Sequence, residues 1–137
     1  MARSALEDVS EATYTALNVS AMTALATGGV YEDPPQGVNF PFVWFTVRED
    51  DTDGTFSQVF KNCRIAVHGF SQYQGSQEVQ TIMNKAVDLL RHTTPSLDNH
   101  TSLLLTHEST TGLPDEEIAG VKTKHAVAEF RLVLAED

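Results

Sequence analysis

The stretch "VYEDPPQGVNFPFVWFTV", from Val30 to Val47, places three prolines and a glycine directly before a run of aromatic and β-branched residues. Proline fixes φ and removes a backbone donor, and glycine allows a turn. Pro41 stands where a strand can begin without its N–H. From Phe42 onward apolar residues occupy both alternating sets of positions, which predicts a strand covered at least partly on both faces. The stretch therefore predicts a rigid turn that delivers the chain into a sheet.

Composition narrows the class of protein. The chain has 137 residues, of which 41% are hydrophobic. This length is typical of a single domain and is sufficient to bury a hydrophobic core. Its net charge of -10, from 19 acidic and 9 basic residues, argues against a surface that binds the phosphates of nucleic acids. Cys63 is the one cysteine, so no intrachain disulfide forms. No signal peptide or membrane-spanning run is recognisable, and we expect no membrane contact.

Helices are predicted on either side of this first strand. Ser4 and Glu7 have the spacing of a capping box, and apolar residues then follow at helical spacing, so a helix is expected from Ala5 to Asn18. A short helical turn from Ala21 to Ala26 ends at the glycine pair 28–29. The second long helix begins at Gly75-Ser76, carries one apolar stripe and stops before Pro95.

Further strands are predicted at 59–70, 102–109 and 121–134. The polar tracts "EDDTDGT" (49–55) and "TTGLPDEEIAG" (110–120) are expected to be exposed acidic loops between them. The fold class is therefore α+β, with a mainly antiparallel sheet of about four strands packed on two helices as a single pair of layers in one domain.

The sheet face away from the helices is mixed in character. Alternation along the predicted strands brings an aromatic residue, two arginines, a histidine and a glutamate to this face, namely Trp44, Arg64, His68, Glu129 and Arg131. Subunit interfaces often have this composition, so these residues are the candidate subunit interface.

No catalytic or metal-binding motif is found. The five histidines lack HxH or HExxH spacing, and although His107 and His125 could face each other across adjacent strands, we predict no metal and no cofactor. Cys63 and His68 point to opposite faces of one strand, which excludes the simplest nucleophile pair. "DDTDG" lacks the glutamate that ends a calcium loop.

Two stretches carry a family resemblance. "ALNVSAMTALATGGVYEDPPQGVNFPFVWFTV" and the later "CRIAVHGFSQYQGSQEVQTIMNKAVDLL" together resemble the tail-completion or tail-terminator proteins of long-tailed bacteriophages and gene transfer agents. The shared pattern is a helix with a small-residue turn, a Val-Tyr pair, a proline-rich turn, a Pro-aromatic strand, and a strand that leads into a Gly-started helix. It covers roughly Leu6 to Leu90.

This resemblance implies a structural virion protein without enzymatic activity, assembled in the host cytoplasm and located in the tail or neck. Such proteins form rings, typically hexamers, that cap the tail tube and join it to the head-tail connector or stopper protein. The partners implied are further copies of the chain, the major tail tube protein and the connector. Acidic side chains that face the lumen or the tube would let DNA pass without binding it, and the candidates are Glu49, Asp50, Asp51, Asp53, Asp115, Glu116 and Glu117.

Three alternatives remain open from the sequence. The nearest is a head-completion or stopper protein of the same virion neck. A second is a non-viral cytosolic binding module with the same α+β architecture. A third is a hydrolase that uses Asp and His side chains from the loops, which would require a pocket with strongly perturbed titratable groups.

Overall fold

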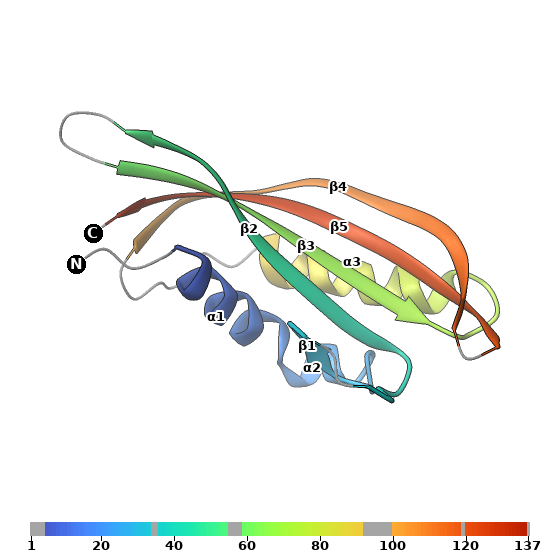
Figure 1. Cartoon of the computed structure of the whole chain (residues 1–137). Coiled ribbons are helices and arrows are strands. Elements are labelled where there is room, and N and C mark those ends of the chain that lie inside the picture. The colour runs from blue at the N-terminus through green and yellow to red at the C-terminus, as the bar shows by residue number, and fades with distance from the viewer. Residues whose placement is uncertain (1–4, 34–35, 55–58, 92–99, 119, 137) are drawn as a thin grey trace.

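The computed structural model describes residues 5–33, 36–54, 59–91, 100–118 and 120–136. The elements follow in the order α1 (Ala5–Leu17), α2 (Ser20–Thr23), β1 (Val30–Tyr31), β2 (Phe42–Gly54), β3 (Val59–Ser71), α3 (Gln77–Arg91), β4 (His100–Ile118) and β5 (Val121–Glu136). The strands form one twisted sheet in the order β1-β2-β3-β5-β4 (Figure 1). The predicted α+β class is confirmed, and none of the helices in these ranges is long and apolar enough to cross a membrane.

The sheet has one strand more than predicted, and it is mixed. β1 runs parallel to β2 and pairs Val30 with Val43 and Tyr31 with Trp44, whereas the remaining neighbours are antiparallel. The backbone N–H of Val43 also donates to the carbonyl of Gly29 at 3.0 Å. This short parallel pairing follows from the turn after α2, which lays the chain along β2 before it enters that strand.

The core lies between one face of the sheet and the helices. Inward residues of β2, β3 and β5 alternate with half-buried or exposed ones, as the sequence pattern predicted. Phe45, Ile65 and Phe130 are at most 1% exposed. Against this face pack the apolar sides of α1 and α3, which contribute Val9, Leu17, Val79, Ile82, Met83, Ala86 and Leu90. Cys63 is fully buried among them, as expected of a small apolar residue.

The first acidic tract does not form a loop. Residues 49–54 continue β2 and pair with β3, so that Asp53 lies opposite Phe60, with one register irregularity between Glu49 and Thr52. The prediction of a loop was wrong over 49–54, because β3 continues alongside and pairs with the backbone of these residues, which overrides the low strand propensity of Asp and Gly. The side chains at 49–54 and residues 55–58 lie outside the described part of the chain.

The second acidic tract is also a strand. β4 reaches Ile118 and β5 starts at Val121, so the two form a long hairpin whose closed end lies on the right in Figure 1. The register shifts between Leu113 and Glu116, around Pro114. A bulge of this kind accommodates a proline that cannot donate to the ladder, which is why the proline did not end the strand.

The glycines around the entry turn have the conformations that the turn requires. Gly29 and Gly37 have φ of 108° and 75°, a region that favours glycine, and the peptide bond between Phe40 and Pro41 is cis. Gly28 donates its N–H to the carbonyl of Pro41 at 2.8 Å. This close approach ties the end of the helical segment to the start of β2. Predictions that rest on Ser4, Pro34, Pro35 and Pro95 lie outside the described residues.

We expect Gly28→Ala to destabilise the fold because a Cβ built at Gly28 would lie 1.7 Å from the carbonyl oxygen of Asn39. The backbone must move to relieve this overlap, at a cost of about 1–3 kcal/mol in the free energy of unfolding. Urea denaturation measures it. Gly112→Ala is the matched control, since a Cβ there meets nothing within 4 Å, and equal stability of both variants would contradict the prediction.

Candidate functional site

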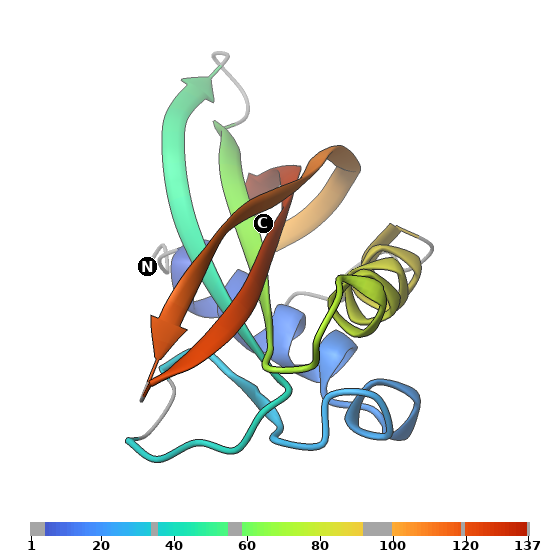
Figure 2. The same cartoon turned by 90° about the vertical axis from the view of Figure 1, so that its right-hand side faces the viewer.

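The five predicted interface residues share one face of the sheet, the face opposite the core, which we call the outer sheet face. Trp44 lies opposite His68, Arg64 lies opposite Arg131, and Glu129 lies opposite Ala66 in the strand register. Directly opposed residues of antiparallel strands point to the same side, so their side chains are neighbours. In Figure 2 α3 lies to the right of β3. Whether this face is a subunit interface stays a prediction.

One end of the outer sheet face carries an aromatic cluster, formed by Phe42, Trp44, His68, Phe70 and His125. Trp44 stacks on His68 with ring centroids 4.7 Å apart, and Phe70 stacks on His125 at 4.2 Å and on Phe42 at 4.9 Å. Phe42 and Phe70 are each only 7% exposed, and the rings of Tyr31 and Phe40 also contact Phe42. The cluster therefore packs on itself across β2, β3 and β5.

Phe42 and Phe70 were not among the residues predicted for the subunit interface. Their signal was present, because Phe42 is two residues from Trp44 and Phe70 is two residues from His68. Both were treated as ordinary strand residues, since stacking across strands depends on the register, which the sequence pattern does not give.

A hydrogen-bonded chain crosses three strands within the cluster. Nδ1 of His68 lies 2.9 Å from Nε2 of His125, and Nδ1 of His125 lies 3.0 Å from Oε1 of Glu116. One of the two facing ring nitrogens must carry a proton and the other must accept it. The chain therefore holds the β4–β5 hairpin to β3 only while at least one of the two rings is neutral.

The protonation of His68 is made unfavourable by its surroundings. Burial under the cluster lowers the pKa of His68 below its usual 6.5, and the charge of a protonated His125 lowers it further. Glu116 accepts a hydrogen bond from Nδ1 of His125. Protonation of both rings would place two positive charges side by side and break the bond between the facing nitrogens.

Trp44 is also fixed by a polar contact at the sheet edge. Its indole Nε1 donates to the carbonyl of Glu32 at 2.7 Å, which ties β2 to the segment that follows β1. The ring remains half-buried. Trp44 is thus held in place while part of its surface stays open, as is typical of aromatic residues in interfaces.

The other part of the outer sheet face carries a row of arginines. Arg48, Arg64 and Arg131 lie side by side on β2, β3 and β5. Like charges directly opposed across strands are unfavourable. Glu108 offsets part of this, since its Oε1 lies 2.9 Å from Nη1 of Arg64, and Arg131 donates to Oδ1 of Asn62 at 3.1 Å. Arg48 was not among the predicted interface residues, although it is four residues from Trp44 and therefore points to the same face of β2.

Two of the three candidate acidic residues of the β4–β5 hairpin bond to side chains of β5. Asp115 forms an ion pair with Lys124 at 2.7 Å, and Glu116 bonds to His125. Glu117 is exposed and lies opposite Lys122. The side chains of Glu49, Asp50, Asp51 and Asp53 lie outside the described residues, so their direction stays a prediction.

Two histidines considered for metal binding do not meet. Nε2 of His107 lies 2.7 Å from Oγ1 of Thr110, whereas His125 contacts His68, so the proposed pairing of His107 with His125 was wrong. The reason is the register of the hairpin, which places His107 opposite Phe130. Within the described ranges, no group of three or more His, Cys, Asp or Glu side chains is placed to hold a metal ion.

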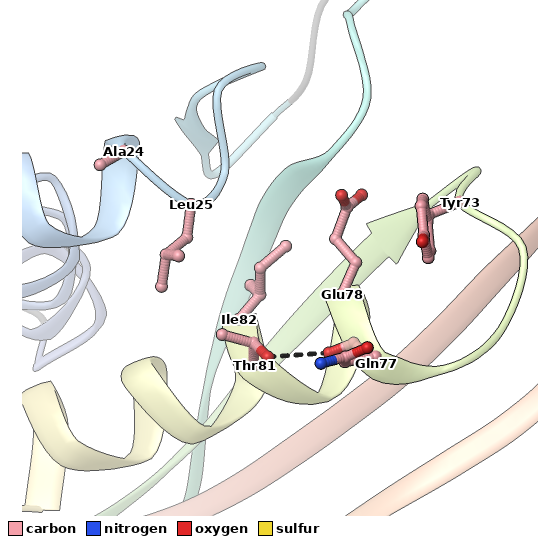
Figure 3. Close-up of a pocket in the computed structure, with 7 residues that line it drawn as sticks. All are labelled: Ala24, Leu25, Tyr73, Gln77, Glu78, Thr81 and Ile82. Carbon is pink, nitrogen blue, oxygen red and sulfur yellow. Dashed lines mark hydrogen bonds between the residues drawn. The ribbon is translucent and has the colours of Figure 1, made fainter.

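Figure 3 shows a surface hollow of about 360 Å³ between the segment after α2 and the start of α3. Its ionisable side chains are Glu78 and Tyr73, and Glu78 accepts a hydrogen bond from Oγ of Ser71 at 2.7 Å. Thr81 bonds back to the carbonyl of Gln77 in the same helix at 2.8 Å. Acid–base catalysis needs a positioned donor or acceptor aimed at a substrate, whereas Glu78 and Thr81 bond within the chain.

Solved structures share this architecture. A chain in the virion of a native gene transfer agent particle is 14% identical with a TM-score of 0.79, over 97% of this chain and 99% of that chain. The gp17 protein of bacteriophage SPP1 is 17% identical with a TM-score of 0.55, over 93% of this chain and 89% of that chain. At these identities the likeness establishes the fold alone. A search of curated protein sequences finds no match.

The family is established from the sequence as a whole. The model of the family described as tail completion protein gp17 matches residues 11–135, so the chain belongs to this family. The protein is therefore a structural component of a virion tail and not an enzyme. The suspected resemblance is confirmed, and the hydrolase and the non-viral binding module were wrong alternatives.

The lowered pKa of His68 predicts a stability that depends on pH. The unfolded chain binds the proton more readily, so the contribution of His68 is fully present above pH 6.5 and is lost as the pH falls through the lower pKa of the folded state. Between pH 8 and pH 5, urea denaturation should show a larger fall in the free energy of unfolding for the wild type than for His68→Gln.

His107→Gln is the matched control, because His107 lies outside the aromatic cluster and should leave the wild-type fall unchanged. Parallel pH profiles of the wild type and His68→Gln would show that His68 does not carry this dependence.

Proposed function

We propose that the protein forms a ring, a hexamer in the simplest case, that caps the tail tube and joins it to the head-tail connector. The DNA passes through the lumen of this ring. The major tail tube protein binds one side of the ring and the connector or stopper protein binds the other. Membership of the family places the chain in the tail. The ring, its stoichiometry and these partners are what we propose in addition.

The observation that carries the proposal is the outer sheet face. A solvated sheet face is normally polar, yet this one carries an aromatic cluster in which Trp44 is half-buried. It also carries a row of arginines, in a protein with 19 acidic and only 9 basic residues. Aromatic residues and arginine are the types enriched in interfaces between subunits. Trp44, Arg64, His68, Glu129 and Arg131 therefore line one side of the contact between adjacent subunits.

The net charge of -10 supports a passage for DNA and argues against a binding site for it. Negative potential repels the phosphate backbone, which allows the genome to move through a lumen without adhering to the wall. The acidic residues on the long β2–β3 and β4–β5 hairpins are the candidates for the lumen or the tube-facing side.

Electron microscopy of tails that carry the protein tests this role. We expect ring-shaped density at the head-proximal end of the tail tube, removed when the gene product is absent. Density on the connector of heads that lack tails would instead identify a stopper, which is the second candidate function. Density at the distal end of the tail would overturn both.

Trp44→Ala should impair assembly much more than folding. The side chain is half-buried in the monomer, so its loss should lower the free energy of unfolding by no more than about 2 kcal/mol. Incorporation of the protein into tails should fall by more than about tenfold, as is typical when an aromatic anchor of an interface is removed. Denaturation and quantitative blotting of purified tails measure the two effects.

Asp88→Ala is the control, since Asp88 is exposed on α3, which packs on the core face of the sheet. It should leave incorporation unchanged. Loss of folding in proportion to loss of incorporation would place Trp44 in the fold and remove it from the interface.

A further inference from the structure

A groove of about 710 Å³ lies between α1 and the strands β1 and β2. Apolar and aromatic side chains form most of its lining, namely Leu6, Tyr14, Val30, Tyr31 and Phe45. Leu6 and Tyr14 are 38% and 43% exposed, so the apolar lining is open to solvent in the single chain. We call this feature the α1–β2 groove.

The wall that α1 contributes is regular and held in place. Leu6, Ser10 and Tyr14 follow one another at intervals of four residues, which puts them in one row along the helix. The ring of Tyr14 packs on Phe45 with centroids 6.4 Å apart, and its hydroxyl accepts a hydrogen bond from Nδ2 of Asn18 at 3.0 Å. The α1–β2 groove therefore exists before any partner binds.

The charges of the α1–β2 groove are all of one sign. Glu7 and Glu11 lie four residues apart on α1, and Glu32 follows β1. All three are exposed, and none of the described residues that line the groove is a lysine or an arginine. A partner that fits the groove must therefore combine apolar side chains with positive charge.

The α1–β2 groove also runs along an open edge of the sheet. β1 pairs with β2 only at Val43 and Trp44, and within the described ranges no strand pairs with that side of β2 beyond Trp44. The N–H of Val43 points to this side, since it donates to Gly29. Backbone direction alternates along a strand, so the N–H and C=O of Val47 point there too. Such an edge can pair with an incoming extended chain.

We propose that the α1–β2 groove binds an extended, basic segment of a different tail protein, which adds a strand to the open edge of β2. Apolar side chains of the segment pack on Leu6 and Tyr14, and its lysine or arginine side chains meet Glu11 and Glu32. The row from Leu6 to Tyr14 is about 12 Å long, which about four residues of extended chain can span. This inference rests on the proposed function, because it gives one of the partners named there a binding site.

Charge argues against a second copy of the chain as the occupant. An added strand must offer an open edge, and β3 and β5, which carry five of the nine basic residues, are paired on both sides. The open edge of β4 belongs to a strand with four acidic residues and no lysine or arginine. The open part of β2 has one arginine against four acidic residues. Each of these edges would be repelled by the acidic groove, whereas a basic segment of another protein is attracted.

The α1–β2 groove adjoins the outer sheet face. The carbonyl of Glu32 accepts the indole N–H of Trp44, and the ring of Tyr31 lies 6.4 Å from that of Phe42 in the aromatic cluster. Side chains of an added strand would alternate between α1 and the outer sheet face. The bound segment would therefore extend the outer sheet face beyond Trp44.

Photo-cross-linking in purified tails tests the site. With p-benzoylphenylalanine in place of Leu6, irradiation should link the chain to a different tail protein. Mass spectrometry of the linked peptide should identify a segment in which lysine or arginine accompanies apolar residues. The control places the same photoreactive residue at Asp88, which is exposed on α3 and does not line the groove, and it should not link to that segment.

Charge reversal provides an independent measurement. Glu11→Lys should reduce incorporation of the protein into tails about tenfold, which corresponds to the loss of one charged contact at an interface. Asp88→Lys makes the same change of charge outside the groove and should leave incorporation unchanged. Glu11 and Asp88 are both exposed, so both variants should unfold in urea like the wild type. Equal incorporation of Glu11→Lys and Asp88→Lys would contradict the proposed binding of a basic segment.

The outcomes separate this inference from the proposed function. Rings on the tail tube with a cross-link from position 6 only to another copy, or with no cross-link, would overturn the groove as a site for a different tail protein and leave the ring in place. Absence of a ring at the head-proximal end of the tube would overturn the proposed function. A cross-link to a basic segment of another tail protein would still support the groove in that case.

Discussion

The structure depends on the burial of one face of the sheet against two amphipathic helices. Phe45, Ile65 and Phe130 point from three adjacent strands into the layer formed by α1 and α3. Because side chains of a strand alternate, a shift of one residue in any of these pairings would bring polar residues into the core and expose the apolar set. The core therefore fixes the register of β2, β3 and β5, and with it every neighbour relation on the other face.

The outer sheet face is a consequence of that register. Once Phe45 is opposite Val67, Trp44 must lie opposite His68, and Arg48, Arg64 and Arg131 must form a row. Directly opposed like charges are unfavourable, and Glu108 offsets part of this through its ion pair with Arg64. Trp44, Arg64, His68, Glu129 and Arg131 lie together on this face, and their role in assembly stays a prediction.

The chemistry of the molecule agrees with the family to which it belongs. Its polar side chains form hydrogen bonds within the chain. The His68–His125–Glu116 chain joins three strands, and Ser71 bonds to Glu78 at the start of α3. The family is a structural one, and these polar side chains bond to one another. α1 and the β4–β5 hairpin leave large apolar side chains exposed, namely Leu6, Tyr14, Leu113 and Val121.

The sequence by itself determined the α+β class, the inward positions of the strands, the apolar stripe of α3 and the burial of Cys63, because all of these follow from local periodicity and from the preference of apolar groups for the core. It also placed the five outer-face residues on a common side. Only the tertiary structure decided that both acidic tracts are strands, since pairing with β3 and β5 outweighs the weak strand propensity of their residues. The partner of His125, the stacking of Phe42 on Phe70 and the parallel pairing of β1 likewise depend on contacts between segments far apart in the chain, which no local pattern encodes.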